Sequence, residues 1–212
     1  WTEAINIASG LPRLDAREKA DAAVEGMTEY VNQHIAQRRR RPGDDLLSAL
    51  IAAEEGGERL LPEELPVMVL QLLVAGHETT RNLIGNGLYC LLRNPGALEP
   101  LRRNPDRLTG AVEEILRFEP PLIWIARTPL EDFEFSGIPV RRGRLLVLNL
   151  AAANRDPEVY SDPHRFDVGR SDHRVLSFGY GAHFCIGASL ARLEGRIALE
   201  VLLDRFDAIE FD

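Results

Sequence analysis

The chain has 212 residues, of which 45% are hydrophobic and 27% are charged, a composition typical of a globular protein with a substantial core. Its net charge of −8 argues against non-specific nucleic-acid binding. Its only two cysteines, Cys90 and Cys185, form neither a disulfide framework nor a zinc motif. They fit a reducing, cytoplasmic setting. The longest apolar run, residues 65–76, is too short to span a bilayer, and the N-terminal residues lack a signal-peptide pattern.

Helical periodicity dominates the chain, with apolar residues three and four positions apart between charged ones. Pro–Gly and Gly–Gly pairs separate the first helices, and either Asp44 or Asp45 is expected to cap the second one. The third helix is long enough to cross a whole domain, so we expect its middle to be buried. Helices are predicted at about residues 15–41, 46–55, 62–93, 106–118 and 186–206.

A different pattern begins near residue 128, where short apolar runs, β-branched residues and glycine turns predict a few strands or hairpins up to residue 150. Residues 151–184 are expected to be mostly irregular. The sequence contains no internal repeat and no clear linker. It therefore predicts a mainly α fold with small β-sheets and gives no sign of a second domain.

The stretch FGYGAHFCIG, residues 178–187, sets three glycines around Cys185. Glycines allow backbone N–H groups to fold closely around a thiolate, and the helix that follows directs its positive end toward the sulfur. Phe178 and Phe184 are expected to add apolar cover. A lone cysteine is more often buried and inert, but this environment favours a ligand-binding thiolate.

This stretch resembles the cysteine-loop signature of the cytochrome P-450 family, F-x-x-G-x-x-x-C-x-G, with Phe178, Gly181, Cys185 and Gly187 at the fixed positions. The resemblance implies the fold of that family and a haem b cofactor whose iron is bound by the Cys185 thiolate, which donates electron density to the metal. The implied activity is a haem-thiolate monooxygenase of the bacterial type. It would insert one oxygen atom of O2 into a small organic substrate by hydroxylation or epoxidation.

The stretch AGHETT, residues 75–80, lies in the middle of the longest helix. Taken alone, it is equally well a buried helical segment that tolerates two threonines, with a possible local bend. In the family the matching pattern covers the distal face of the haem. The resemblance therefore implies that Ala75 and Gly76 lie against the cofactor, that Thr79 hydrogen-bonds bound dioxygen, and that Glu78 relays protons toward it.

Glu114 and Arg117 lie three residues apart and share one helix face. The sequence alone favours an exposed ion pair worth about 0–1 kcal/mol. The resemblance implies instead a buried structural pair that holds the cysteine loop and is completed by an arginine from a later loop. DPHRF, residues 162–166, offers Arg165 for that place, although His164 stands where the family more often has Glu.

The resemblance assigns two further residues, Arg127 and His183, to the haem propionates, because a guanidinium and an imidazole suit carboxylates. Residues 122–125 would line the substrate side, and NRDP at 154–157 matches a recurring segment of the family. The motifs follow the family's order over about residues 63–206. They correspond to the later part of such a protein, so the resemblance implies that residues 1–212 are a single partial domain. We do not expect them to form a complete haem pocket unaided.

The implied partners are a ferredoxin or flavodoxin-type electron donor, a small hydrophobic substrate and O2, without nucleic acid or membrane. Five arginines and three acids between residues 163 and 196 predict a basic face that would steer an acidic donor. Two alternatives stay open: a peroxide-driven haem peroxygenase, which the Glu78–Thr79 pair disfavours, and a truncated haem-free fragment without activity. A thiol hydrolase is disfavoured because Cys185 and His183 are too close in one loop to align.

Overall fold

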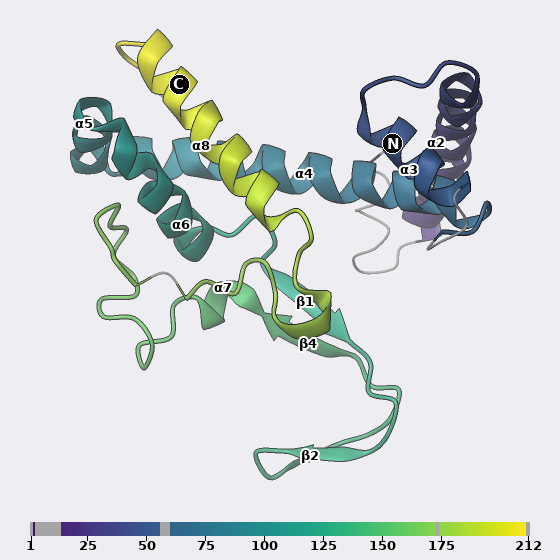
Figure 1. Cartoon of the computed structure of the whole chain (residues 1–212). Helices are drawn as coiled ribbons and strands as arrows, with labels where there is room; N and C mark the ends of the chain where they lie inside the picture. The colour runs from purple at the N-terminus through teal and green to yellow at the C-terminus, as the bar shows by residue number, and fades with distance from the viewer. Residues whose placement is uncertain (1, 3–13, 56–59, 173, 211–212) are drawn as a thin grey trace. The chain divides into compact units, whose positions relative to one another are not determined.

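The computed structural model of the chain describes residue 2 and residues 14–55, 60–172 and 174–210. These residues form two compact units, one ending at Glu78 and the other beginning at Thr79. The fold is mainly helical with two small two-stranded sheets, which confirms the predicted class (Figure 1). No helix in the described ranges is long and apolar enough to cross a membrane.

The first unit contains α2 (Leu14–Arg40), α3 (Leu46–Glu55) and the first part of α4 (Glu64–Arg93). Val31, Ile35, Ile51 and Leu65 form its buried apolar cluster. The Asp45 carboxylate caps α3 by accepting the backbone N–H of Ser48 at 2.8 Å, so Asp45 rather than Asp44 is the capping residue. That hydrogen bond, together with the nearby Arg38 guanidinium, holds the pKa of Asp45 below its usual value.

The second unit continues α4 and adds both sheets. Strands β1 and β4 pair antiparallel, with Trp124 opposite Asn149 and Arg127 opposite Leu146. Strands β2 and β3 form a hairpin whose two turn residues, Ser136 and Gly137, have φ of 49° and 79°, as a two-residue hairpin turn requires. The further elements are α5 (Pro95–Arg103), η1 (Pro105–Arg107), α6 (Leu108–Phe118), β1 (Trp124–Arg127), β2 (Phe133–Phe135), β3 (Ile138–Val140), β4 (Leu146–Asn149), α7 (Leu150–Ala153), η2 (Gly181–His183) and α8 (Ala188–Arg205).

Two glycines allow the helices of the second unit to pack closely. A Cβ on Gly87 of α4 would lie 3.0 Å from Cδ1 of Ile115 on α6, and a Cβ on Gly195 of α8 would lie 3.0 Å from Cδ2 of Leu83 on α4. The contacts between α4, α6 and α8 therefore depend on the absence of side chains at these positions. The cluster that they enclose includes Leu83, Leu91, Val112, Ile115, Leu116, Leu199 and Leu203.

Two expectations about the helices are wrong. The pair Pro95–Gly96 ends α4 but also begins α5, because proline is tolerated in the first helical turn. The middle of α4 is largely exposed rather than buried, with Leu73 at 43% exposure. Its buried residues lie toward the two ends, with Leu65 in the core of the first unit and residues 83–91 in that of the second.

The glycine packing predicts different effects for two substitutions on one helix. Gly87→Leu should lower the free energy of unfolding by about 1–3 kcal/mol, because the added side chain meets Ile115. Gly85→Leu is the matched control, since nothing lies within 4 Å of a Cβ there. It should be neutral or stabilising by up to about 1 kcal/mol. Urea denaturation measures both, and equal unfolding free energies for the two variants would contradict the packing account.

Candidate functional site

Cys185 lies between η2 and α8 in a loop that closes on itself. The Cys185 N–H donates to the Phe178 carbonyl oxygen at 2.9 Å. Gly179 and Gly181 have φ of 73° and 76°, in the left-handed region that glycine adopts without strain. A Cβ on Gly187 would lie 3.8 Å from the Cys185 Sγ, so the backbone passes close to the sulfur. The glycine frame read from the sequence thus forms one tight turn around an exposed thiol.

The sulfur lies at the start of α8 and beside apolar side chains. The Ala188 N–H donates to the Cys185 carbonyl at 3.2 Å as the helix begins, so its positive end is next to the thiol. Tyr180, Phe184 and Ile186 are 88%, 53% and 93% exposed. An exposed soft ligand among exposed apolar side chains fits a flat, largely apolar metal cofactor. Phe184 is therefore part of this exposed surface, whereas the Phe178 ring packs against the core.

The two cysteines differ in chemistry. Cys90 is buried on α4, and burial raises the pKa of its thiol to about 12. That thiol stays neutral at physiological pH, and its burial keeps it away from a cofactor that binds at the surface. Cys185 is thus the thiol that the fold presents to solvent.

Asn154 fixes the point at which the cysteine loop begins. Its side chain is fully buried. Its Oδ1 accepts the Leu176 N–H at 2.7 Å, and its Nδ2 donates to the Ser177 Oγ at 2.8 Å. The Ser177 hydroxyl in turn donates to the Leu116 carbonyl of α6. The sequence pattern marks NRDP only as a recurring segment and gives no signal for this role.

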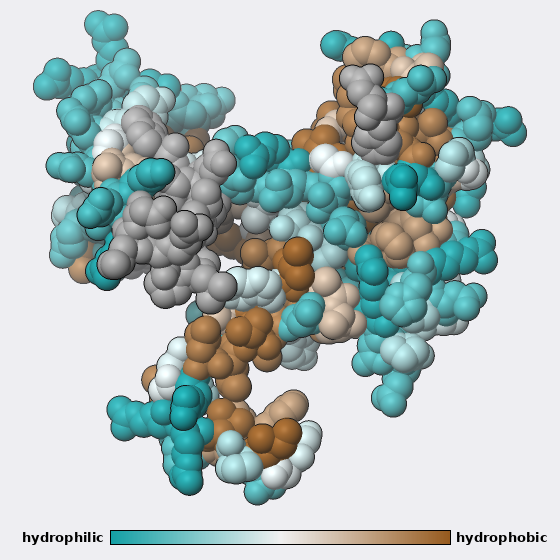
Figure 2. Space-filling model, turned by 180° about the vertical axis from the view of Figure 1, so that it is seen from behind, coloured by the Kyte–Doolittle hydropathy of each residue, from teal (hydrophilic) through white to brown (hydrophobic). Residues whose placement is uncertain are grey.

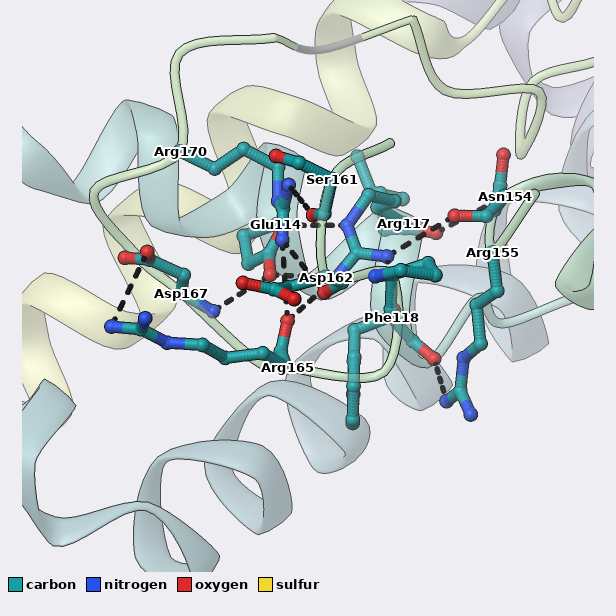
Figure 3. Close-up of polar contacts among 12 residues, drawn as sticks. Glu114, Arg117, Phe118, Asn154, Arg155, Ser161, Asp162, Arg165, Asp167 and Arg170 are labelled. Carbon is teal, nitrogen blue, oxygen red and sulfur yellow. Dashed lines mark hydrogen bonds and ion pairs between the residues drawn. The ribbon is translucent and has the colours of Figure 1, made fainter. Parts of the chain in front are cut away.

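Glu114 and Arg117 form a buried bidentate ion pair on α6 (Figure 3). Both side chains have zero exposure, and the two N–O distances are 2.7 and 2.8 Å. The remaining guanidinium N–H groups donate to the carbonyl oxygens of Asn154, Pro163 and Arg165 at 3.2, 2.8 and 3.0 Å. The pair is therefore buried and tied to the later loop, as the family resemblance implied, rather than exposed.

The arginine that completes this network differs from the expected one. Arg170, with 10% side-chain exposure, reaches the Glu114 Oε2 through its Nε at 3.2 Å (Figure 3). The Arg165 side chain is 69% exposed and pairs with Asp167 at 3.7 Å. Arg165 contributes its carbonyl instead, because a turn in which its N–H donates to Asp162 directs that carbonyl inward. Both arginines lie in irregular chain, so sequence spacing could not choose between them.

The distal candidates lie on α4, which runs unbroken through them. Ala75 and Gly76 are exposed, and the Glu78 side chain is 12% exposed. The Thr2 hydroxyl donates to Glu78 at 3.4 Å. Thr79 is half-buried at the start of the second unit.

Arg127 and His183 are both exposed, on β1 and η2. Arg127 donates to the neighbouring Ala126 carbonyl at 2.8 Å. Within the described ranges, no carboxylate lies within ion-pair distance of either side chain. Both are suited to an external anion such as a propionate.

The residues expected to line the substrate side are exposed and apolar. Leu122, Ile123 and Trp124 are 45%, 54% and 39% exposed, and Ile125 is half-buried. Figure 2 shows apolar side chains gathered over β1, β4 and the β2–β3 hairpin. Of this exposed surface, Leu122 to Ile125 lie just before Arg127 in the chain. The surface is compatible with binding an apolar molecule.

The predicted basic face is neutralised by ion pairs. Each of the five arginines between residues 163 and 196 pairs with a carboxylate, and three of these acids lie outside that stretch. The count of charged residues within 163–196 therefore overestimates the positive electrostatic field around the cysteine loop. The pairs are Arg165–Asp167, Arg170–Glu114, Arg174–Asp172, Arg192–Glu113 and Arg196–Glu200.

The Cytochrome P450 family model matches residues 7–210. The chain is 50% identical over 207 residues to Cytochrome P450 107B1 of Saccharopolyspora erythraea, covering 97% of this chain and 50% of the relative. It is 43% identical to the polyketide biosynthesis cytochrome P450 PksS of Bacillus subtilis, covering 92% of this chain and 48% of the relative. The chain thus spans about half the length of the curated relatives it matches.

Solved structures agree with this similarity. The PksS structure from Bacillus subtilis superposes with a TM-score of 0.89 at 41% identity, covering 97% of this chain and 52% of the other. P450BioI, solved in complex with an acyl carrier protein ligated to hexadec-9Z-enoic acid, gives a TM-score of 0.89 at 39% identity. That match covers 98% of this chain and 55% of the other.

The burial of the Glu114–Arg117 pair predicts a large effect of breaking it. Arg117→Gln should lower the free energy of unfolding by about 3–5 kcal/mol, because it leaves the Glu114 carboxylate buried with a weakened partner set. Arg103→Gln is the control, since it breaks an exposed pair with Glu99 at 80% and 60% exposure. It should cost less than about 1 kcal/mol. Denaturant titration measures both, and similar small losses would show that the pair is not a structural centre.

Proposed function

Because the chain belongs to the cytochrome P450 family, we propose that it carries the cysteine-ligand part of a haem-thiolate monooxygenase. Proteins of this family bind haem. The proposed reaction inserts one oxygen atom of O2 into a small organic substrate by hydroxylation or epoxidation. The observation that carries the proposal is the exposed Cys185 thiol at the N-terminus of α8, held in a closed glycine turn. The Cys90 thiol does not compete as an iron ligand, because it is buried and burial raises its pKa.

The side chains around Cys185 fit a haem b group. The thiolate would bind the iron, and Arg127 and His183 would pair with the propionates. The turn formed by Phe178, Gly181 and Gly187 would hold the sulfur in place, and the exposed Phe184 and Ile186 would contact the apolar part of the porphyrin. When bound, the haem supplies the activation of dioxygen.

Glu78 and Thr79 are proposed to deliver protons on the opposite side of the cofactor. A threonine hydroxyl donates a hydrogen bond and can pass on a proton that a neighbouring carboxyl holds. The low exposure of the Glu78 side chain, 12%, supports a carboxyl that exchanges protons through defined neighbours. Ala75 and Gly76, with minimal side chains, would let the cofactor approach the helix backbone.

The substrate is proposed to be a small hydrophobic molecule that contacts residues 122–125. This is supported by the exposed apolar side chains at 122–124. One similar protein is named for polyketide biosynthesis, and another was solved in complex with a fatty-acyl carrier protein. We propose a ferredoxin or flavodoxin-type electron donor acting in the cytoplasm. Since the arginines near the cysteine loop are paired, donor recognition would depend on local shape and individual charges rather than on a net basic field.

The ligand assignment is tested by absorption of the reduced, carbon-monoxide-bound holoprotein. Cys185→Ser should abolish the Soret band that is diagnostic of thiolate ligation, because a serine hydroxyl does not replace the thiolate. Cys90→Ala, which removes the buried thiol, should keep that band. If Cys185→Ser keeps the band, the site assignment is wrong. A protein that shows no Soret absorption after haem loading would favour a haem-free fragment.

Proton delivery separates the monooxygenase from a peroxygenase. Thr79→Ala should reduce product formation driven by NAD(P)H and an electron donor by about 10²-fold or more, because the positioned hydroxyl is lost. Product formation driven by peroxide should change much less, since peroxide brings its own protons. Product analysis under both conditions measures this. Turnover with peroxide alone, insensitive to Thr79→Ala, would favour the peroxygenase.

A further inference from the structure

The Arg192 side chain of α8 contacts Glu113 of α6 and also the ring of Phe178, the first residue of the cysteine loop. Its Nε donates to the Glu113 Oε1 at 2.5 Å, and a terminal nitrogen donates to Oε2 at 3.2 Å. Its Cζ also lies 4.4 Å from the centre of the Phe178 ring. One guanidinium thus makes a forked ion pair and a cation–π contact at once, which fixes its plane.

The Glu113 partner is well shielded from solvent. The Glu113 side chain is 13% exposed and that of Arg192 35%. Arg196, one turn further along α8, has a different environment. It pairs with Glu200 on its own helix at 37% and 45% exposure. Within the described part of the chain, Arg192 is the arginine of α8 whose guanidinium lies over a ring of the cysteine loop.

Phe178 contacts both Arg192 and Cys185. The Phe178 carbonyl accepts the Cys185 N–H at 2.9 Å, and its ring packs against the core. A change in the position of Phe178 therefore moves the acceptor of the Cys185 amide. Asn154 fixes the residues just before Phe178, while Arg192 fixes the Phe178 ring itself.

We infer that Arg192 is a positioning residue for the cysteine loop, acting through Phe178 on the orientation of Cys185. As a statement about the metal ligand, this rests on the proposed function. The contacts themselves belong to the chain without its cofactor, so the inference can fail while Cys185 still binds haem.

The test compares Arg192→Gln with Arg196→Gln by hydrogen exchange of the Cys185 amide in the full-length holoprotein. Arg192→Gln should accelerate that exchange about tenfold, because a cation–π contact and a charged pair are lost. Arg196→Gln should leave it within about twofold, since its pair lies away from the loop. Arg192→Lys keeps the charge but not the planar fork and should give an intermediate rate.

A double-mutant cycle separates positioning from general destabilisation. Phe178→Leu should accelerate Cys185 exchange in the wild-type background but add much less in the Arg192→Gln background, because the two side chains act as one unit. In the holoprotein, Arg192→Gln should shift the haem midpoint potential relative to Arg196→Gln. Independent effects of Arg192→Gln and Phe178→Leu, or equal exchange in the Arg192→Gln and Arg196→Gln variants, would overturn the inference. Loss of the thiolate band in Cys185→Ser would remain unaffected by that result.

Discussion

The buried ion pair between Glu114 and Arg117 is the constraint on which the second unit depends. Two charges with zero exposure are costly to hold away from water unless each remaining donor and acceptor finds a partner. The α6 helix cannot supply those partners by itself. Carbonyls from residues 154, 163 and 165, the Asp167 N–H and the Arg170 guanidinium supply them. The Tyr160 ring adds a face 5.3 Å from the Arg117 Cζ. A long irregular segment is thereby required to wrap around one helix.

This wrapping explains how a mostly irregular segment can present a defined ligand. The same segment carries Asn154, whose buried amide binds the backbone at Leu176 and the hydroxyl of Ser177. Phe178 follows directly and accepts the Cys185 N–H. The Cys185 sulfur can therefore be exposed while the Cys185 backbone is held in place. Asn154 anchors the residues before the turn, and α8 anchors those after it. An exposed, oriented thiol is what a metal cofactor needs from its protein ligand.

Local signals in the sequence predicted most helices well, because periodic apolar residues and capping residues act over short distances. The α5 helix was missed because Pro95–Gly96 has the pattern of a stop signal, although proline also suits a helix start. Features that depend on distant contacts were harder to predict. Neither the choice of Arg170 over Arg165 nor the role of Asn154 follows from spacing, since each depends on which backbone groups turn inward. The exposure of Leu73 likewise depends on what packs over α4 rather than on its own pattern.

The contacts of the buried ion pair make the loop and α6 one cooperative structure. Native-state hydrogen exchange measures this through the amides of Asp167 and Leu176, which donate to the Glu114 carboxylate and the Asn154 side chain. If the buried pair holds the segment, these two amides should open with the same free energy as the amides of Ile115 and Leu116 within α6. Opening of Asp167 and Leu176 at much lower free energy, while the α6 amides stay protected, would show that the segment is held independently and would contradict the account.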